Sequence, residues 1–137
     1  MIRPEVLRKR LAKLDEYLAI LRQIRRYLYQ EFLDNPERYG SAERFLQLAI
    51  ETLTDLGNHV IAELELGNVD WYSDIPHRLC EAGYIDNQIE QTWVRMIGFR
   101  NILIHEYLEI DREIVYRVLQ ENLDDLDELK RIFVRFL

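Results

Sequence analysis

The stretch LRKRLAKLDEYLAILRQIRRYLYQEF, residues 7–32, decides the fold class because its apolar side chains recur every three or four positions. Apolar residues stand at positions 7, 11, 14, 18, 21, 28 and 32, with charged residues between them. That period is typical of an amphipathic helix whose apolar side packs against other helices. We therefore predict one long first helix, which stops at Asn35-Pro36 and Gly40 because proline disfavours helix in the residue before it.

The same period continues along the rest of the chain, where glycines and capping residues divide it into four further helices. We expect them from Ser41 to Gly67-Asn68, from Ser73 or Asp74 to Gly83, from Asp86 to the segment at 98–107, and from near Asp111 to Phe136. The predicted fold is all-α: an up-and-down bundle of four long helices plus one short helix, in a single domain over residues 1–137.

The composition fits this prediction and excludes several classes of protein. Three prolines and five glycines are too few for the many tight turns of a β-sandwich. The single cysteine, Cys80, allows no internal disulfide, and we expect it to be a small core residue in a reducing compartment. No apolar stretch approaches the roughly 20 residues that cross a bilayer. We expect a cytoplasmic protein with no membrane partner.

The charge is unevenly distributed. The formal net charge is −7, yet residues 1–30 hold eight Lys or Arg against three Asp or Glu, so they carry +5 and the remainder carries −12. A basic helix on an acidic body suits a phosphate ligand or an acidic partner, and it equally suits an ordinary solvated face. The overall negative charge argues against a broad nucleic-acid-binding surface.

Metal and cofactor sites have little support in the sequence. The histidines, His59, His77 and His105, fall on three different predicted helices, and neither a zinc-binding spacing nor a glycine-rich phosphate loop is present. We predict no metal and no cofactor. Asp55 and His59 are four residues apart and share a helix face, either as support for a site or as an ordinary hydrogen-bonded pair. Tyr27, Tyr29, Trp71 and Tyr72 are assigned no role, because aromatics in such positions usually pack.

The segment GFRNILIHEY, residues 98–107, differs from an ordinary core segment. It places a permanent cation, an amide, an imidazole and a phenol within eight residues. On a regular helix, Arg100 and His105 point about 140° apart. They converge only if the chain leaves the helix between them or if a second subunit supplies the partner groups. The alternative is that Arg100 pairs with a buried carboxylate and His105 caps the helix end.

These residues resemble the R-x-x-x-x-H-x-Y signature of the HepT-like toxins in the HEPN superfamily. The asparagine after the arginine and the tyrosine two residues after the histidine both match, and the helical order and the Asp55…His59 pair also suit the family. The resemblance implies a homodimeric, metal-independent ribonuclease toxin with an RNA substrate. It also implies a partner, a minimal nucleotidyltransferase antitoxin of the MntA kind, which transfers AMP to the motif tyrosine. Arg100 and His105 would be catalytic, Asn101 accessory and Tyr107 the modified residue.

Elementary chemistry supports the implied activity. Metal-free RNA cleavage uses the neighbouring 2′-OH as nucleophile, so the protein supplies only proton transfer and charge stabilisation. Histidine suits the first task and arginine the second. Two other functions stay open at this point. One is a non-catalytic helical module that binds a nucleotidyltransferase, and the other is a nucleotide-binding bundle with no toxin role.

Overall fold

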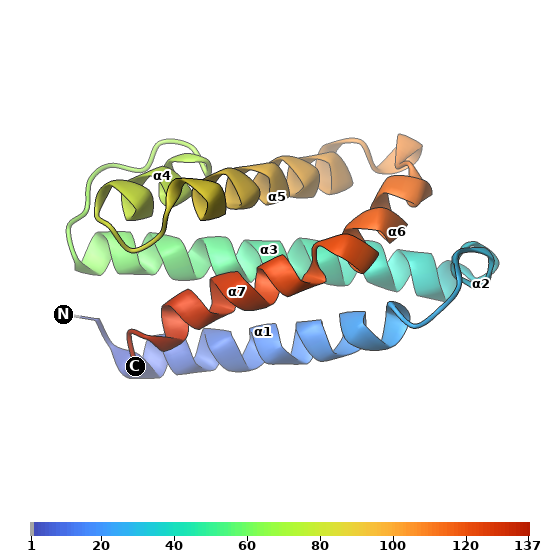
Figure 1. Cartoon of the computed structure of the whole chain (residues 1–137), viewed down its shortest axis with the longest axis horizontal. Coiled ribbons are helices and arrows are strands. Elements are labelled where there is room, and N and C mark those ends of the chain that lie inside the picture. Colours follow the sequence, from blue (N-terminus) through green and yellow to red (C-terminus); the bar gives the residue numbers. More distant parts are fainter. Residues whose placement is uncertain (1) are drawn as a thin grey trace.

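The computed structural model describes residues 2–137 and, within that range, consists of helices and connecting segments with no β-strand. The elements, shown in Figure 1, are α1 (Pro4–Ile24), α2 (Tyr29–Leu33), α3 (Pro36–Glu63), α4 (Asp74–Glu81), α5 (Asn87–His105), the 3₁₀ helix η1 (Tyr107–Glu109), α6 (Arg112–Glu121) and α7 (Leu123–Val134). The predicted all-α bundle, with long helices and the short α4, is confirmed.

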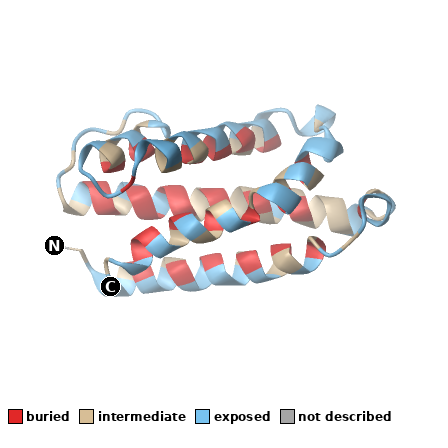
Figure 2. Ribbon diagram, in the orientation of Figure 1, coloured by how far each residue is buried: buried red, intermediate tan, exposed pale blue. Residues whose placement is uncertain are grey.

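Helix α3 is the centre of the bundle. Helices α1 and α7 pack on one side of it, and α4 and α5 pack on the other (Figure 1). The buried side chains face inward along each long helix, as Figure 2 shows. Trp93 of α5 is fully buried and meets the ring of Phe133 edge-on, with the centroids 5.8 Å apart. Gly57 of α3 allows this close packing, because a Cβ there would lie 2.5 Å from Ile75 and 3.1 Å from Trp93.

The first helix is shorter than predicted. It ends at Ile24, and residues 29–33 form the separate helix α2. The backbone turns because α6 binds the carbonyl groups at the end of α1: the Tyr116 hydroxyl donates to the carbonyl of Tyr27 at 2.7 Å, and Gln120 donates to that of Arg25 at 2.8 Å. Tertiary contacts thus satisfy the backbone groups that a continued helix would have bonded internally.

The predicted start of the second helix at Ser41 is also wrong. Helix α3 begins at Pro36 and continues through Gly40 and Ser41. The side chain of Asn35 accepts a hydrogen bond from the Glu37 amide at 2.9 Å and so caps the helix. Pro36 occupies the first helical position, where its missing N–H costs nothing. The Asn35-Pro36 pair therefore starts a helix instead of only ending the previous one.

The last predicted helix is divided at Asn122 into α6 and α7, which meet at an angle in Figure 1. The Asn122 side chain donates to Asp125 at 2.9 Å, and its backbone N–H bonds to Val118. The break keeps both Leu119 and Leu123 buried while the chain bends around the bundle. Helix α4 agrees with the prediction: it ends before Gly83, which has φ +84°. The prediction that Asp86 caps α5 is likewise confirmed.

Candidate functional site

The motif lies at the carboxyl end of α5. The helix stays intact through His105, so the chain does not leave the helix between Arg100 and His105. The two side chains therefore project about 140° apart around the helix axis. Arg100 faces α3 and is largely buried, whereas His105 is exposed. One chain alone does not bring these two residues to a common point.

Arg100 is held by α3 through a single hydrogen bond. Its Nη2 donates to Oε1 of Glu51 at 3.2 Å, and its Nη1 donates to Oδ1 of Asn101 at 3.1 Å. The Arg100 Nε atom is buried and has no hydrogen-bond partner among residues 2–137. The guanidinium carbon lies 5.1 Å from the ring centroid of Tyr72. The expected pairing of Arg100 with a partly buried carboxylate is thus present, but it leaves donor capacity unused.

A hollow of about 100 Å³ lies beside the Arg100 guanidinium. Residues from three segments line it: Ile50, Glu51, Thr54 and Asp55 of α3, Tyr72 of the loop before α4, and Ile97 and Arg100 of α5. The hollow contains a cation, two carboxylates and an aromatic ring in a small space. Such convergence of polar groups in a concave surface is typical of a ligand-binding position.

Asp55 borders this hollow, whereas His59 does not. Partial removal of water raises the pKa of the Asp55 carboxyl above its ordinary value, an effect that Arg10 and Arg100 oppose and Glu51 reinforces. Within the described part of the chain no hydrogen bond joins Asp55 to His59, and the buried Nε2 of His59 has no partner there. The structure therefore gives only Asp55 a place beside the motif arginine.

The outward face of α5 is exposed and partly apolar. Val94, Gly98, Asn101, Ile102 and His105 share this face by helical spacing, with Val94 39% and Ile102 43% exposed. Apart from the neighbouring residues and backbone of α5 itself, no atom among residues 2–137 lies within 4 Å of where a Gly98 Cβ would be. A mid-helix glycine costs stability, and packing inside this chain gives no reason for it. His105 and Asn101 therefore stand on a surface suited to close approach by another helix.

Beyond His105 the chain forms the exposed helix η1. Tyr107 is 68% exposed and Leu108 is 84% exposed. The Tyr107 side chain is therefore accessible from solvent.

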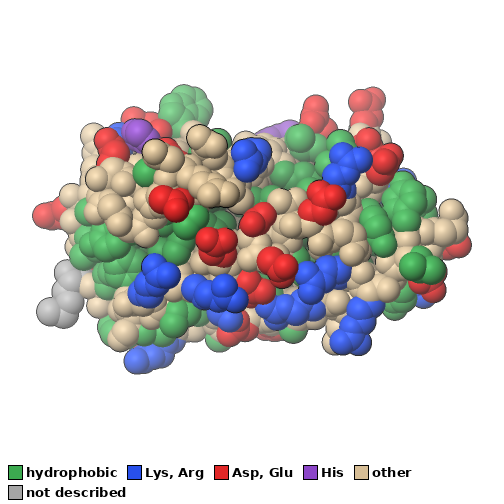
Figure 3. Space-filling view, in the orientation of Figure 1, with side chains coloured by type: hydrophobic (Ala, Val, Ile, Leu, Met, Phe, Trp, Pro, Cys, Tyr) green, Lys and Arg blue, Asp and Glu red, His purple; other side chains and the backbone are tan. Residues whose placement is uncertain are grey.

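Near its carboxyl end, the basic first segment is engaged by α7. Arg22 Nη2 lies 2.6 Å from both carboxylate oxygens of Asp127, and Arg25 pairs with Asp124 at 3.5 Å. Lys130 of α7 pairs in turn with Asp15. Figure 3 shows Lys and Arg side chains beside Asp and Glu over this face. Arg8, Lys9 and Arg26 are exposed and have no ion-pair partner among residues 2–137, so both interpretations of the basic segment, a binding surface and a solvated face, stay open.

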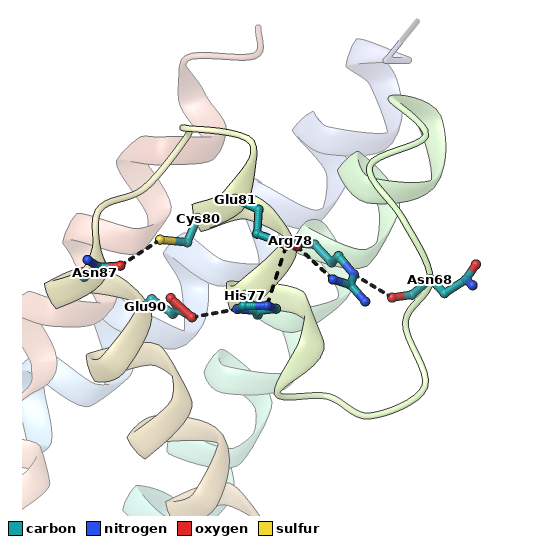
Figure 4. A network of polar contacts seen from close by, with 7 residues as sticks. All are labelled: Asn68, His77, Arg78, Cys80, Glu81, Asn87 and Glu90. Atoms are coloured by element: carbon teal, nitrogen blue, oxygen red, sulfur yellow. Dashed lines mark hydrogen bonds and ion pairs between the residues drawn. The ribbon is translucent and has the colours of Figure 1, made fainter.

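A polar network fixes the loop that carries Tyr72 (Figure 4). Arg78 of α4 donates from Nε to the carbonyl of Asn68 at 3.0 Å and from Nη1 to Glu81 at 2.8 Å. The bond from Arg78 lowers the pKa of Glu81. Gly67, with φ +123°, passes so close to Arg78 that a Cβ would lie 3.0 Å from its Cδ and Nε. The loop is thereby held against α4.

The same network joins α4 to α5. His77 Nδ1 lies 3.1 Å from Glu90, and the Cys80 thiol donates to Asn87 at 3.3 Å (Figure 4). Loss of surrounding water raises the pKa of Cys80, which disfavours a reactive thiolate. Cys80 is half-buried and packs against the core, close to the expected core position.

Two residues that the sequence analysis did not select lie in the hollow. Glu51 is four residues before Asp55 on α3, a spacing that places both carboxylates on one face. Tyr72 had no predicted role, because aromatic residues in loops usually pack, but it is 52% exposed and lines the hollow.

Two negative findings concern the described residues alone. Within residues 2–137, no group of three or more His, Cys, Asp or Glu side chains is arranged to hold a metal ion. In the same range, no helix combines the length and apolar character that crossing a membrane requires.

The chain is thus an all-α bundle with an Arg-His-Tyr motif at the end of α5. A sequence model of the family described as Ribonuclease HepT-like matches residues 14–132. The chain belongs to the Ribonuclease HepT-like family.

Two curated relatives are nucleases by name. The mRNA nuclease HepT of Shewanella oneidensis is 30% identical over 83 residues, which cover 61% of this chain and 62% of that protein. The tRNA nuclease HepT of Aphanizomenon flos-aquae is 25% identical over 118 residues, 86% of this chain and 80% of that protein. The chain thus spans less than two thirds of the Shewanella relative.

A solved structure has the same fold. The tri-AMPylated HEPN toxin of Shewanella oneidensis, in complex with its MNT antitoxin, superposes with a TM-score of 0.84 at 22% identity, over 95% of this chain and 97% of that one. This likeness supports the bundle architecture.

Proposed function

We propose that this chain is a metal-independent endoribonuclease toxin, neutralised by AMP transfer from a cognate minimal nucleotidyltransferase to Tyr107. Membership of the Ribonuclease HepT-like family supports the ribonuclease class. The observation that carries the proposal is the state of Arg100, which is positioned by Glu51 beside a hollow and keeps a buried, unpartnered Nε within residues 2–137. Buried donors usually have a partner, and the hollow beside this guanidinium leaves room for a phosphate to supply one.

Each motif residue has a distinct role in the proposal. His105 takes the proton from the attacking 2′-OH or gives a proton to the leaving 5′-oxygen, and it exchanges that proton with solvent. Arg100 stabilises the negative charge on the phosphate oxygens. Asn101 is an accessory group that orients Arg100 through the bond from Nη1. Asp55 helps to shape the electrostatic surroundings of Arg100.

The proposed active form is a homodimer. Since Arg100 and His105 diverge in one chain, the proposed two-fold axis passes beside the carboxyl end of α5, between the face that carries His105 and the hollow beside Arg100, so that His105 of one protomer approaches Arg100 of the other. The exposed Val94 and Ile102 and the bare Gly98 suit such an approach.

AMP on Tyr107 would block this site. The tyrosine follows His105 by two residues and is exposed, so the antitoxin can reach its hydroxyl. The modification adds a nucleoside and a negatively charged phosphodiester near the proposed cleft. Both bulk and charge oppose entry of an RNA phosphate.

The test is cleavage of a labelled RNA panel in EDTA by the wild type and by His105→Ala, with analysis of the product ends. We expect cleavage by the wild type alone, with 2′,3′-cyclic or 3′-phosphate ends. Loss of all wild-type cleavage in EDTA would contradict metal independence. If the unmodified wild type, with its mass checked for added AMP, cuts no RNA with or without divalent metal, the protein is instead the non-catalytic partner of a nucleotidyltransferase.

A further inference from the structure

A second, larger hollow continues from the one beside Arg100. It has a volume of about 400 Å³, within the usual range for small-molecule sites. Thr54, Asp55 and Tyr72 line both hollows, so together they form one trough between α3 and the loop before α4. The remaining lining residues of the larger hollow are Asn58, Val69, Asp70, Trp71 and Ile75.

The walls of the trough carry two exposed aromatic rings. Trp71 is 74% exposed and Tyr72 is 52% exposed, although both belong to a loop held in place at several points. The carboxylate of Asp74 accepts hydrogen bonds from the backbone N–H groups of Asp70 and Trp71, each at 3.0 Å, and these bonds lower its pKa. Arg78 holds the other end of the loop at Asn68. Exposed aromatic rings on a fixed loop are suited to stacking an unpaired base.

The polar groups of the trough are arranged in sequence along it. Arg100 is at one end, Asp55 and Tyr72 line both hollows, with the Tyr72 ring 5.1 Å from the Arg100 guanidinium, and Trp71 lines only the larger hollow. A phosphate suits the arginine end. The middle, with carboxylates and no cation besides Arg100 among the described lining residues, repels phosphate and accepts hydrogen bonds from donors.

We propose that the trough binds a single unpaired guanine of the RNA, stacked on Trp71 and Tyr72, with its Watson–Crick edge at Asp55 and a neighbouring phosphate at Arg100. The inference rests on the proposed ribonuclease function and gives that site a base preference. Guanine presents two adjacent donors, N1–H and the N2 amino group, which match the two oxygens of one carboxylate. Adenine and cytosine present a ring-nitrogen acceptor beside their amino group, and uracil presents one donor between two acceptors, so a carboxylate fits each of them less well.

The chain contains its own reporter for this binding. Its two tryptophans differ completely in exposure: Trp93 is fully buried and Trp71 is 74% exposed. A base that stacks on Trp71 quenches its fluorescence and leaves the emission of Trp93 unchanged. The assay needs no cleavage, so it is independent of catalysis.

The experiment titrates wild-type protein with 2′-O-methyl hexanucleotides, which lack the attacking 2′-OH. The probes are a uridine hexamer and the same hexamer with one central guanine or one central adenine. We expect quenching by the guanine probe at a concentration at least about tenfold lower than by the other two, a preference of the size that one good base-edge contact gives. Trp71→Phe removes the signal and verifies the reporter.

Matched variants separate the roles in the trough. Asp55→Asn is expected to remove the guanine preference, whereas Glu128→Gln, an exposed carboxylate on α7, removes the same charge and keeps the preference. Tyr72→Ala is expected to weaken binding of the guanine probe about tenfold, in line with loss of one stacking partner. Tyr84→Ala, at an exposed tyrosine outside the trough, serves as its control.

The outcomes distinguish this inference from the proposed function. Equal quenching by all three probes, a guanine preference that survives Asp55→Asn, or quenching by a basic peptide but by no oligonucleotide would overturn the guanine site. If the protein gives one of these results and still cleaves RNA, the guanine site is excluded and the proposed nuclease function is supported. Guanine-dependent quenching in a protein that cuts no RNA would support the binding site and contradict the nuclease function.

Discussion

Two helix–helix interfaces of the bundle each contain an arginine that reaches a carboxylate on another helix, but the two arginines have different roles. Between α1 and α7, Nη2 of Arg22 lies 2.6 Å from both oxygens of Asp127, and further ion pairs flank it. Between α3 and α5, Arg100 makes one bond of 3.2 Å to Glu51 beside a hollow. Arg22 joins the helices at a partly exposed position, whereas Arg100 is largely buried and lines a hollow that a ligand can enter.

The contrast shows how a structural arginine can be told from a functional one. Both residues pair with acids, so pairing alone does not distinguish them. The distinguishing features are the buried Nε of Arg100, which has no partner in residues 2–137, and the free volume next to its guanidinium. Buried polar atoms usually have partners, but Glu43, His59 and Trp93 also carry unpartnered buried atoms within residues 2–137, so the hollow beside the guanidinium is the feature that indicates a ligand.

The largest expected effect comes from alanine substitution of the motif residues, compared with the same substitution at Arg22. Arg100→Ala and His105→Ala are each expected to lower RNA cleavage by about 10² or more, since each removes a group that acts in the transition state. Arg22→Ala is expected to leave the cleavage rate unchanged and to cost at most about 1 kcal/mol of stability, because its ion pair is partly exposed. Cleavage assays and thermal unfolding measure both quantities. Equal loss of cleavage in Arg22→Ala would remove the distinction.

The next effect concerns the outward face of α5. Gly98→Glu adds a charged side chain where no described atom lies within 4 Å, so the single chain tolerates it. If this face is the dimer interface, the variant is a folded monomer and cuts no RNA. Sedimentation at micromolar concentration, with circular dichroism for the fold, provides the measurement. A Gly98→Glu protein that stays dimeric and active would exclude this face.

A smaller effect is expected from Glu51. Glu51→Gln keeps the size of the side chain but weakens its charge-assisted bond to Arg100, so the guanidinium is positioned less well. We expect about a tenfold lower kcat with little change in KM. Because Glu51 acts through Arg100, adding Glu51→Gln to the Arg100→Ala protein should lower kcat no further. Additive losses would assign Glu51 an independent role.

The smallest effect is a pH-dependent stability change at Glu43. Burial raises the pKa of this carboxyl above 4.5, with Arg112 opposing the shift, and its buried Oε2 has no partner among residues 2–137. Ionised Glu43 therefore destabilises the fold above the raised pKa, and this penalty disappears below 4.5, where both states are protonated. Glu43→Gln is expected to raise Tm by a few degrees at most at pH 7, with no difference near pH 4. A lower Tm at pH 7 would contradict this assignment.

The sequence was sufficient for the fold class because the 3.6-residue period is continuous and most caps are local. It failed where a distant segment decided the backbone. The end of α1 at Ile24 depends on Tyr116 and Gln120 of α6, which lie about ninety residues away in the chain. The N-cap at Asn35 was local, but proline was interpreted only as a helix breaker.

The candidate site likewise has one part that the sequence predicted and another part that only the folded structure reveals. The motif at Arg100 and His105 is visible in the sequence because its residues are five apart and match a known signature. Glu51 and Tyr72 lie 49 and 28 positions before Arg100, so only the folded bundle brings them to it. Trp71 and Tyr72 were given no role because exposure and loop rigidity are not visible in composition.

The most direct test of a composite site is complementation between two inactive variants. Arg100→Ala and His105→Ala chains with different tags are co-expressed, and the mixed dimer is purified and assayed for RNA cleavage in EDTA. Because the two residues diverge on one helix, the account predicts that the mixed dimer, with one intact Arg100 and one intact His105, recovers cleavage at least about tenfold above either parent. A mixed dimer as inactive as its parents, under conditions where the wild type cuts, would contradict a site shared between two chains.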